Sequence, residues 1–567
     1  MSNEELADRL YDIADMLEIE GVQWEPRAYR TAAMTISSLS TDVSEVYRQG
    51  KLTELEGVGK SIAGSIEEYI KTGEIEKWKK LKKKYDIDFS TFRKMRGLGP
   101  KRLYVLYKKL GIKNVEDLKN ALDKNKIRDL EGFGEKSEEE IKKNLNFLLK
   151  SNTGRKLLGS VIEYAYNLRD ELMKSGFFEK VEIAGSTRRM KETVGDLDIL
   201  CVSTNPSKGM DFARNMKEVK NVIVSGETKT SVDLDIGLSC DVRIVKKESF
   251  GSAMQYFTGN KDHNVKLRKI AISKGLKLNE YGLFKGKTAI AGASEDGVYK
   301  ALGLDWMPPE LRENMGELEA AANHSLPHLV ELSKIKGDLH VHTLDSDGAD
   351  TLEQMAAAAE KRGLSYIALT NHSRSLKIAN GLDEGRFSSL MDKIDKFNSK
   401  SRIKVLKGVE LEILKDGSLD LPSKLLKSMD FVLGALHQNL KMSRHELTER
   451  LLKAINSGLI SCVAHPTDRL ISQREALDLD FDRIFSACKN NDVLLEIDGF
   501  PDRSDLPFDM VKKAKEEKIR FSLGSDSHRL EHLRFLDLAV AIARRGWLEG
   551  KDIVNTLGYE DILKLRR

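Results

Sequence analysis

The chain has 567 residues, 40% hydrophobic and 32% charged, with a formal net charge of +4. Because this length exceeds what one hydrophobic core usually organises, we expect three or four domains. No run of about 18 apolar residues and no charged-then-apolar leader is present, which argues against a membrane or secreted protein. The cysteines form no CxxC pair, so we expect a cytoplasmic protein without a thiolate metal site.

The first 150 residues have the apolar spacing of helices and few strand signals. An apolar residue, Gly-x-Gly and a helix recur in LEGVGKSIAGSI, MRGLGPKRLYVL and LEGFGEKSEEEI. The two glycines permit a tight turn that leaves backbone N–H groups free to bind a phosphate oxygen at a helix N-terminus. One copy is typical of a structural turn, but three copies resemble helix-hairpin-helix DNA-binding motifs. The expected DNA-binding residues are Gly57, Gly59, Lys60, Gly97, Gly99, Gly132 and Gly134.

A strongly basic segment lies between the first two glycine motifs and beyond. Residues 77–109 contain 13 Lys/Arg and two Asp, a local excess of +11. Such a charge run is more typical of a solvated helical face than of a binding site. The interleaved Tyr85, Tyr104 and Tyr107 shift the interpretation only slightly towards nucleic acid.

From about residue 155 the pattern becomes mixed α/β. Strands are predicted at 181–186, 197–203, 221–226 and 239–246, and a helical segment follows from about 250. Asp196 and Asp198 share one face of the second strand, and Asp241 begins the apolar stretch DVRIV. Such carboxylates need a cation between them, and two Mg²⁺ ions are usual where phosphates are handled. For GDLD by itself, a solvent-facing edge strand is an equal alternative.

The segments GSTRR, GDLDIL, DVRIV, YFTGNKDHNVKLR and NEYG together resemble the catalytic core of a family X DNA polymerase, across the first 310 residues. The resemblance implies that Asp196, Asp198 and Asp241 hold two Mg²⁺ ions for nucleotidyl transfer from a dNTP to a primer 3′-OH. It also implies contacts to the template by Arg268. The dNTP-binding residues that it implies are Gly185, Ser186, Arg189, Gly195, Tyr256, Phe257, Gly259 and Asn264. For the aromatic pair alone, core packing would be the better interpretation.

One departure concerns a second activity of β-type members of this family. They carry a Schiff-base lysine in the helix after the first hairpin, and alignment of GVGKSIAGSI places Ser65 there. A serine cannot form the imine, so we expect no 5′-deoxyribose-phosphate lyase activity by that route. Lys60 is shifted from this position, and phosphate contact is its expected role.

The final 230 residues alternate strands with helices, which is the rhythm of a parallel α/β barrel. The predicted strands are 338–342, 366–372, 405–414, 431–437, 459–465, 493–498 and 520–526. Nearly every one of them ends in a potential metal ligand, and a parallel barrel collects the carboxyl ends of its strands at one face. A lone histidine in such a place is usually structural, but chance explains the whole set poorly.

Neutral imidazoles combined with carboxylates suit Zn²⁺, Mn²⁺ or Fe²⁺ better than Mg²⁺. Nine ligands are too many for one ion, so two or three ions bridged by a carboxylate are implied. The expected ligands are His340, His342, Asp347, His372, Glu410, His437, His465, Asp526 and His528.

Together with HPTDR, LEIDGFPDR and GSDSH, these ligands resemble a PHP domain over about residues 336–567. The resemblance implies a Mn²⁺-dependent 3′–5′ exonuclease, with some end processing or abasic-site cleavage. Two positions depart from the family pattern. Asn371 replaces the acid of the usual TDH, where it could orient neighbouring ligands, and Asp468 replaces the glycine of HPTGR. We therefore expect these two replacements to preserve metal binding, with nuclease activity less certain than metal binding.

The predicted fold is multidomain α and α/β. It joins a helical helix-hairpin-helix region, a polymerase β-like nucleotidyltransferase palm with a helical dNTP-binding subdomain, and a distorted (β/α)7 PHP barrel. The predicted boundaries are 1–85 for an N-terminal helical DNA-binding domain, 86–150 for a helix-hairpin-helix subdomain, 151–248 for the palm, 249–316 for the dNTP-binding subdomain, 317–335 for a linker and 336–567 for the PHP domain.

The leading hypothesis is a repair enzyme that fills gaps in DNA and trims 3′ ends. We expect it to bind gapped, nicked or primer-template DNA and dNTPs, with Mg²⁺ at the palm and Mn²⁺ or Zn²⁺ at the barrel. We also expect a monomer without membrane partners. One alternative is a phosphoesterase of small molecules or 3′-phosphates with a vestigial polymerase core. The intact Asp196, Asp198 and Asp241 disfavour it, and two complete metal sites disfavour the other, a non-enzymatic DNA-binding scaffold.

Overall fold

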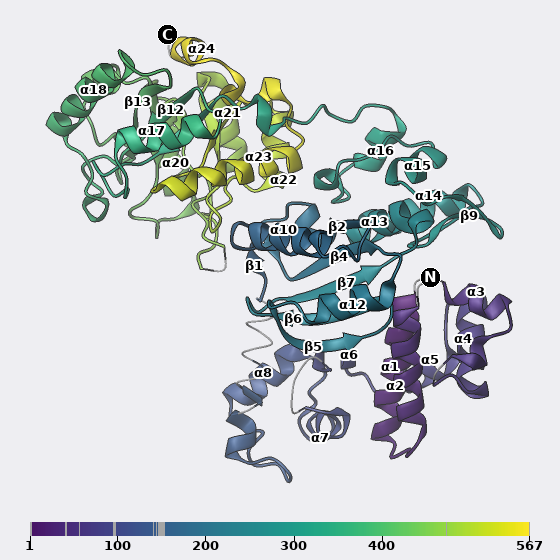
Figure 1. Cartoon of the computed structure of the whole chain (residues 1–567). Coiled ribbons are helices and arrows are strands. Elements are labelled where there is room, and N and C mark those ends of the chain that lie inside the picture. The colour runs from purple at the N-terminus through teal and green to yellow at the C-terminus, as the bar shows by residue number, and fades with distance from the viewer. Residues whose placement is uncertain are drawn as a thin grey trace. The chain divides into compact units, whose positions relative to one another are not determined.

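The computed structural model describes residues 3–39, 42–55, 57–93, 98–139, 141–142, 145, 154–471 and 473–565 (Figure 1). The chain divides into two compact units, and each contains several stretches of sequence. Unit 1 comprises Met1–Lys156, Ile162–Arg188 and Thr193–Trp306, and unit 2 comprises Leu157–Val161, Arg189–Glu192 and Met307–Arg567. None of the described helices is long and apolar enough to cross a membrane.

The N-terminal part of unit 1 is helical, as predicted. Apolar residues at helical spacing in the first helix, including Leu6, Leu10 and Ile13, are fully buried in its core. The elements are α1 (Asn3–Ile19), α2 (Glu25–Ser38), α3 (Val43–Arg48), η1 (Leu52–Glu54), α4 (Lys60–Thr72), α5 (Glu76–Lys84), α6 (Phe89–Phe92), α7 (Pro100–Leu110) and α8 (Val115–Asp123).

The glycine motifs lie in tight turns before helices. Gly59 is the N-cap of α4, and Gly99 is the N-cap of α7. In the third motif the backbone N–H of Glu138 donates to the carbonyl of Gly134 at 2.9 Å, as at the start of a helix. Gly97 lies outside the described residues. The described parts of all three motifs therefore have the local geometry that phosphate binding by backbone N–H groups requires.

Gly57 should be intolerant of substitution, and we predict that Gly57→Ala destabilises the N-terminal helical region. Its φ is +78°, and a Cβ there would lie 2.6 Å from the backbone nitrogen of Ala32 and 2.7 Å from Cβ of Thr31. The left-handed backbone alone costs about 1 kcal/mol or more. We expect the calorimetric transition of this region to fall by roughly 4–8 °C or more. Gly59→Ala is the matched control, because open space surrounds Gly59, and equal transitions for the two variants would contradict the prediction.

The second part of unit 1 is a five-stranded sheet in the order β2-β4-β7-β6-β5. Pairing of β4 with β7 is parallel, and the other pairs are antiparallel. The strands are β2 (Lys180–Ile183), β4 (Asp196–Val202), β5 (Val219–Ser225), β6 (Lys229–Leu234) and β7 (Ser239–Ile244). The sequence analysis missed β6, because its short segment KTSVDL has only two strongly apolar residues.

Helices and short strands complete this part of the chain, and among them only Leu157–Val161 belong to unit 2. The predicted helical segment from 250 also contains a three-stranded antiparallel sheet, β10-β9-β8, which was not predicted because its strands have only three or four residues. The elements are β1 (Lys156–Leu157), α10 (Leu158–Lys174), α11 (Gly185–Arg188), β3 (Thr193–Val194), α12 (Pro206–Arg214), η2 (Lys247–Ser249), α13 (Phe250–Thr258), α14 (Lys261–Ser273), β8 (Lys277–Asn279), β9 (Gly282–Lys285), β10 (Thr288–Ala291) and α15 (Glu295–Ala301).

The described residues of unit 2 form a seven-stranded sheet with its strands in chain order. Every neighbouring pair is parallel, and a bridge between Val341 and Ser527 brings the first strand to the end of the last. The strands are β11 (Gly337–Val341), β12 (Tyr366–Leu369), β13 (Lys404–Glu412), β14 (Phe431–Ala435), β15 (Cys462–Val463), β16 (Leu494–Asp498) and β17 (Phe521–Gly524). The predicted barrel is thus confirmed in a nearly closed form.

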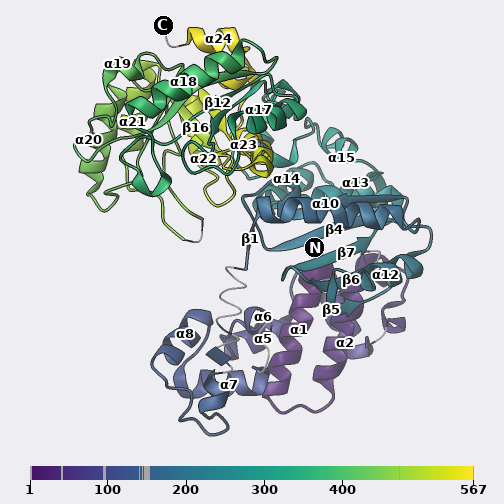
Figure 2. The ribbon, with the colours of Figure 1, turned by 60° about the vertical axis from the view of Figure 1, so that its left-hand side comes forward.

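Helices connect the barrel strands, and Figure 2 shows α17, α18 and α20 to α23 around β12 and β16. The connecting helices are α17 (Leu352–Lys361), η5 (Lys377–Ala379), α18 (Glu384–Asn398), α19 (Ser423–Leu426), α20 (Arg444–Ile455), α21 (Phe481–Asn491) and α22 (Phe508–Glu516). After the last strand come η6 (Leu530–Phe535) and α23 (Leu536–Arg545). The segments before and after the barrel supply η3 (Pro309–Leu311), α16 (Glu317–Ala322), η4 (Leu332–Lys334), η7 (Gly550–Asp552), η8 (Val554–Thr556) and α24 (Tyr559–Lys564).

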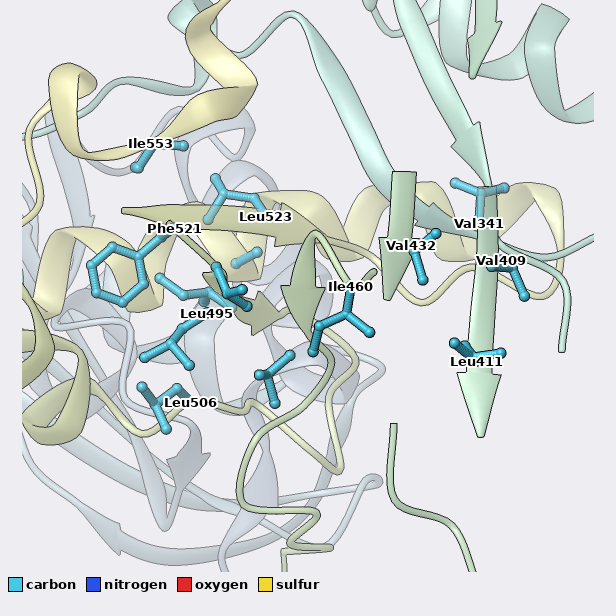
Figure 3. Packing of buried hydrophobic residues seen from close by; sticks show 14 of the residues in the cluster. Val341, Val409, Leu411, Val432, Ile460, Leu495, Leu506, Phe521, Leu523 and Ile553 are labelled. Carbon is cyan, nitrogen blue, oxygen red and sulfur yellow. The ribbon is translucent and has the colours of Figure 1, made fainter. Parts of the chain in front are cut away.

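The strands of the barrel are buried on both faces. Figure 3 shows Val341, Val409, Leu495 and Phe521 in the larger hydrophobic cluster, and Leu339 belongs to a second cluster. Strands buried in this way are nearly continuous hydrophobic runs. Charged side chains within them are therefore exceptional, and they occur in β11, β13 and β16. Because a buried charge is costly unless it is paired or binds a metal, these strands locate the polar site.

Candidate active sites

Strand pairing brings the predicted acids of unit 1 together. In the parallel ladder of β4 and β7, Asp198 lies directly opposite Asp241. Asp196 lies two residues before Asp198 in β4, so the two side chains share a face of the sheet. This arrangement places three carboxylates at neighbouring positions of one sheet face.

Positive groups and a close backbone approach surround two of these acids. Lys229 Nζ and Arg243 Nη2 lie 3.1 and 2.9 Å from Oδ2 of Asp241. Burial raises the pKa of Asp241, but Arg243 and Lys229 outweigh it and the pKa is lowered. Gly185 has φ +64°, and a Cβ at this position would overlap the carboxylate of Asp198.

The acids fit a magnesium site by their chemistry. Oxygen ligands on adjacent strands suit this hard cation, and the missing Cβ of Gly185 leaves room beside Asp198. Asp196 is exposed and Asp198 is partly exposed, so a ligand can reach them from solvent. The chemistry and placement of Asp196, Asp198 and Asp241 are therefore compatible with a bound divalent cation.

Four of the predicted dNTP-binding residues lie together at the end of α13. The rings of Tyr256 and Phe257 pack edge to face with centroids 5.0 Å apart, and the Asn264 amide donates to the Tyr256 carbonyl at 2.7 Å. Gly259 is the C-cap of α13. The Arg243 guanidinium lies 4.6 Å from the centre of the Phe257 ring, which links this group to Asp241.

The other predicted dNTP-binding residues are more scattered. Ser186 lies in α11, and its buried hydroxyl has no hydrogen-bond partner among the described residues. Arg189 belongs to unit 2, where its Nε lies 3.0 Å from Glu313 Oε1, so its contact with a triphosphate stays a prediction. Gly195 faces the side chain of Arg155.

Two arginines make ion pairs within unit 1. Arg188 binds both carboxylate oxygens of Glu295, at 2.8 and 2.6 Å. The predicted template residue Arg268 lies 3.9 Å from Glu5 of α1. Its role therefore stays a prediction.

The histidine set of unit 2 forms one cluster around Glu410. The imidazole nitrogens of five histidines lie 2.8 to 3.4 Å from its two carboxylate oxygens, in the part of the chain that the structure describes. Glu410 is 2% exposed, so these contacts are shielded from water. The five are His340, His342, His372, His437 and His465.

Two further carboxylates extend the cluster in different directions. Asp526 Oδ1 lies 3.4 and 3.2 Å from Nε2 of His340 and His342. Asp347 Oδ2 lies 3.4 Å from Nε2 of both His372 and His528. The ligand atoms form three groups within metal-binding range of one another: His342, Asp347, His372 and His528; His340, His342 and Asp526; and His372, Glu410 and His437.

Burial and charge give the cluster a distinctive electrostatic state. Burial lowers the pKa of His342 to about 3, and the neighbouring His528 and His372 act in the same direction. Burial also lowers the pKa of His372, but Glu410 and Asp347 outweigh it and raise that pKa to about 10. Burial raises the pKa of Glu410, yet the surrounding histidines hold it well below its usual range. The carboxylates are thus poised to hold cations.

The donor set fits divalent metal ions. Nε2 of His340 and both ring nitrogens of His342 are buried without a hydrogen-bond partner among the described residues. Such orphaned nitrogens beside carboxylates are costly unless an ion binds them. The mixture of imidazole and carboxylate favours Zn²⁺, Mn²⁺ or Fe²⁺, and the three overlapping groups favour more than one ion.

Two buried glutamates that the sequence analysis missed orient the ligands. Glu412 Oε2 lies 2.9 Å from Nδ1 of His437, and Glu496 Oε1 lies 2.7 Å from Nδ1 of His340. Glu496 also accepts from the backbone N–H of His465 at 2.7 Å. A signal was present, because each is an acid inside an apolar strand, in VELEIL and LEID. Carboxylates in this position fix the tautomer and orientation of metal-binding imidazoles.

Glu412→Gln should weaken metal binding without removing a ligand. The amide cannot act as a charged acceptor for the His437 N–H, so we expect the metal affinity of the barrel to fall by about 10- to 100-fold. Titration of the full chain with Mn²⁺, followed by electron paramagnetic resonance, measures this. Glu446→Gln is the control, because Glu446 caps α20 and contacts none of the ligands. An unchanged affinity in Glu412→Gln would contradict the role given to Glu412.

The two departures from the family pattern are both accommodated. Asn371 is fully buried, and its Oδ1 accepts from Thr343 N and Ser346 Oγ, each at 2.8 Å, so it fixes the loop that carries Asp347. Asp468 has φ +46°, the kind of backbone that favours the usual glycine, and its carboxylate is 2% exposed. The amide of Asn371 thus still orders the ligand loop.

Four family models match separate parts of the chain. They are a helix-hairpin-helix domain at residues 1–75, a SAM-like helix-hairpin-helix tandem at 89–146, a DNA polymerase beta thumb at 253–313 and a PHP domain at 338–499. The first three lie before or after Asp196, Asp198 and Asp241, which none of the four covers, and the last covers His340 to Glu496 of the histidine cluster.

Known proteins match the chain in whole or in part. The chain is 34% identical, over 99% of both sequences, to a Bacillus subtilis (strain 168) protein named DNA polymerase/3′-5′ exonuclease PolX. A probable phosphatase of Thermoanaerobacter sp. (strain X514) is 27% identical over 39% of this chain and 91% of its own length. DNA polymerase lambda of Arabidopsis thaliana is 26% identical over 50% of this chain and 57% of its own length.

Proposed function

The chain belongs to the family X DNA polymerases that carry a C-terminal PHP domain, and we propose that it extends and trims DNA 3′ ends at two separate sites. The palm of unit 1 joins a dNTP to a primer 3′-OH, and the barrel of unit 2 hydrolyses the terminal phosphodiester. The proposed substrates are dNTPs and gapped, nicked or primer-template DNA. The setting we propose is short-gap repair in the cytoplasm by a monomer.

The observation that carries this proposal is the presence of two chemically different, complete donor sets in one chain. Asp198 and Asp241 face each other across β4 and β7. The histidines converge on Glu410 in the barrel. A vestigial polymerase would not need to retain Asp198 opposite Asp241. Nor would it need the Lys229 and Arg243 partners of Asp241, and their presence disfavours a simple phosphatase.

In the palm, each group of residues has its own task. Mg²⁺ bound to the acids would supply charge neutralisation for the triphosphate and acidify the primer 3′-OH. Arg243 and Lys229 keep Asp241 ionised. Ser186 offers a buried hydroxyl to a phosphate oxygen, and the paired rings of Tyr256 and Phe257 wall the incoming sugar. The Asn264–Tyr256 hydrogen bond holds this wall in place.

In the barrel, the protein's own residues orient the ligands and limit the access of water. Mn²⁺ or Zn²⁺ bound there would activate a water molecule and neutralise the phosphodiester charge. Glu412 and Glu496 fix the rings of His437 and His340. Asp347 and His528 retain 29% and 27% of their side-chain exposure, so a DNA end is best received on their side of the cluster. Abasic-site cleavage is a further outcome that this chemistry would allow.

In the helical region, Gly57, Gly59, Lys60, Gly99, Gly132 and Gly134 would bind backbone phosphates on either side of a gap. The five domains and one linker predicted from the sequence remain part of the proposal. We propose no lyase activity, because Ser65 is a buried residue of α4 and its hydroxyl donates to the Ser61 carbonyl at 3.4 Å.

A primer-extension assay on DNA with a single-nucleotide gap tests the proposal. We expect one dNMP to be added with Mg²⁺ or Mn²⁺, and a 3′-labelled strand to be shortened with Mn²⁺. The absence of incorporation with both metals would refute the polymerase function. Release of phosphate from small phosphoesters, with 3′ ends left intact, would support a phosphatase instead.

A further inference from the structure

Arg503 lies beside the metal-binding cluster but belongs to none of its ligand groups. Its Nε is 3.7 Å from Oδ2 of Asp526 and 3.8 Å from Oδ2 of Asp498. These distances exceed hydrogen-bond length, so the guanidinium is near both carboxylates without being bound to them. The other oxygen of Asp526 faces His340 and His342. Arg503 is thus the cation next to a predicted ligand, on the side away from the histidines.

A single hydrogen bond anchors this guanidinium. Nη1 of Arg503 donates to Oδ1 of Asp468 at 2.8 Å, and no bond from Nε or Nη2 is found in the part of the chain that the structure describes. The side chain retains 17% of its exposure. Nη1 of the guanidinium is therefore fixed, and the N–H groups of Nε and Nη2 can still donate to a ligand.

The backbone around Arg503 is held firmly. Arg469 Nε donates to the carbonyl of Arg503 at 2.9 Å, and the backbone N–H of Thr467 donates to the carboxylate of Asp505 at 3.0 Å. These bonds tie the loop after β16 to the loop that carries His465 and Asp468. The position of the guanidinium relative to the cluster is therefore set by the fold.

Asp468 has more positive charge around it than its own neutralisation requires. Arg474 Nη2 donates to the same Oδ1 of Asp468, at 2.7 Å. Arg474 alone would compensate this carboxylate, and the charge of Asp526 is directed to an ion when the cluster is loaded. Asp498 is then the remaining carboxylate near Arg503, and the Nε and Nη2 groups, which are not hydrogen-bonded to it, can donate to an anion. A guanidinium suits phosphate, because its planar fork donates two parallel hydrogen bonds to two phosphate oxygens.

We propose that Arg503 binds the phosphodiester at the 3′ end of DNA in the barrel, and that Asp468 positions its guanidinium. This inference rests on the proposed nuclease function of the barrel. It also gives a role to Asp468, which replaces the glycine of the usual HPTGR motif. A glycine at this position would leave Nη1 of Arg503 without its hydrogen-bond acceptor. Arg503 is the substrate-contacting residue, and Asp468 is a positioning residue that acts through it.

Binding of inorganic phosphate to the Mn²⁺-loaded full chain tests this role without relying on activity. An Asp198→Ala background removes a ligand of the palm, and phosphorus relaxation by bound Mn²⁺ reports phosphate at the barrel. We expect Arg503→Met to weaken phosphate binding by about 10- to 100-fold, with the Mn²⁺ stoichiometry unchanged. Unchanged phosphate affinity would overturn the proposal. Loss of bound Mn²⁺ would also overturn it, because Arg503 would then support Asp526 only.

Steady-state kinetics on a 3′-labelled strand, measured in the chain that retains Asp198, show whether Arg503 binds the DNA end or only stabilises the fold. We expect Arg503→Met to raise KM for the DNA end more than it lowers kcat. Asp468→Gly, which the φ of +46° tolerates, should raise KM by about 3- to 10-fold. Arg444→Gln is the matched control, because it removes an exposed arginine of the barrel that pairs with Asp478 and should leave KM unchanged. Equal KM values for wild type and Asp468→Gly would refute the positioning role.

Two further outcomes are distinguishable. If Arg503→Met does not fold, Arg503→Lys is the test variant, because it keeps the positive charge and loses the planar guanidinium. A weakened phosphate affinity in Arg503→Lys would support the proposal. An unchanged affinity would refute the proposed two-bond contact of the guanidinium with phosphate. A wild-type chain that binds phosphate in an Arg503-dependent way but leaves DNA ends intact would refute the nuclease function and leave the phosphate role of Arg503 standing.

Discussion

Asp198→Ala should abolish nucleotide incorporation and leave degradation of 3′ ends intact. Asp198 lies opposite Asp241 in the β4–β7 ladder, and its loss removes the middle of the three acids. Metal-based stabilisation of charge is worth several kcal/mol, so we expect the single-turnover rate of gap filling to fall by roughly a thousandfold or more. The 3′ trimming rate in Mn²⁺, measured on the same protein preparation, should stay within about twofold of wild type by the independence of separate sites.

Asp170→Ala is the matched control for charge. Asp170 is a partly exposed acid of α10 that pairs with its neighbour Arg169, and its removal changes the net charge of unit 1 by the same amount. We expect it to retain incorporation. If Asp198→Ala lost both activities while Asp170→Ala kept them, the two sites would not be independent.

His342→Ala should have the opposite effect. His342 belongs to two of the three ligand groups and is fully buried, so its removal leaves both groups incomplete. Because even partners that only orient a ligand are worth 10- to 100-fold, we expect 3′ trimming to fall by at least about a hundredfold. The metal content of the purified chain should fall with it. Gap filling should continue, because the palm acids are untouched.

His445→Ala controls for the loss of an imidazole. His445 lies on α20 with 79% of its side chain exposed and contacts none of the ligands. It should keep its metal content and trimming rate. Full trimming activity in His342→Ala would show that the histidine cluster is not the nuclease site.

The barrel was predictable because its strands are long apolar runs that end in polar residues. The structure ends the strands earlier than the sequence suggested: β12 ends at Leu369 and β14 at Ala435, so His372 and His437 follow the strands. The prediction survived because residues just past the ends of parallel strands still meet at one face. The contacts made by Glu410 could not be predicted, since they depend on which strands are neighbours in space.

The features that could not be predicted from the sequence are short strands and contacts between residues far apart in the chain. Strand β6 and the sheet of β8 to β10 are too short for a clear period-2 pattern. The pairing of Arg189 with Glu313 joins positions 124 residues apart, and no local pattern indicates it. Glu412 and Glu496 did carry a signal, because an acid within an otherwise apolar strand must have a buried partner.

The closing edge of the barrel has a mechanical consequence. Past the end of β17, His342 N donates to the Ser527 carbonyl at 2.8 Å and Ser527 N donates to the His340 carbonyl at 3.3 Å, and His340, His342 and Asp526 lie at that same edge. An ion bound by these three side chains would cross-link the first strand to the segment that follows the last strand. The energy of metal binding would then add to the stability of the closed barrel, and a chelator should loosen this seam before any other part of unit 2.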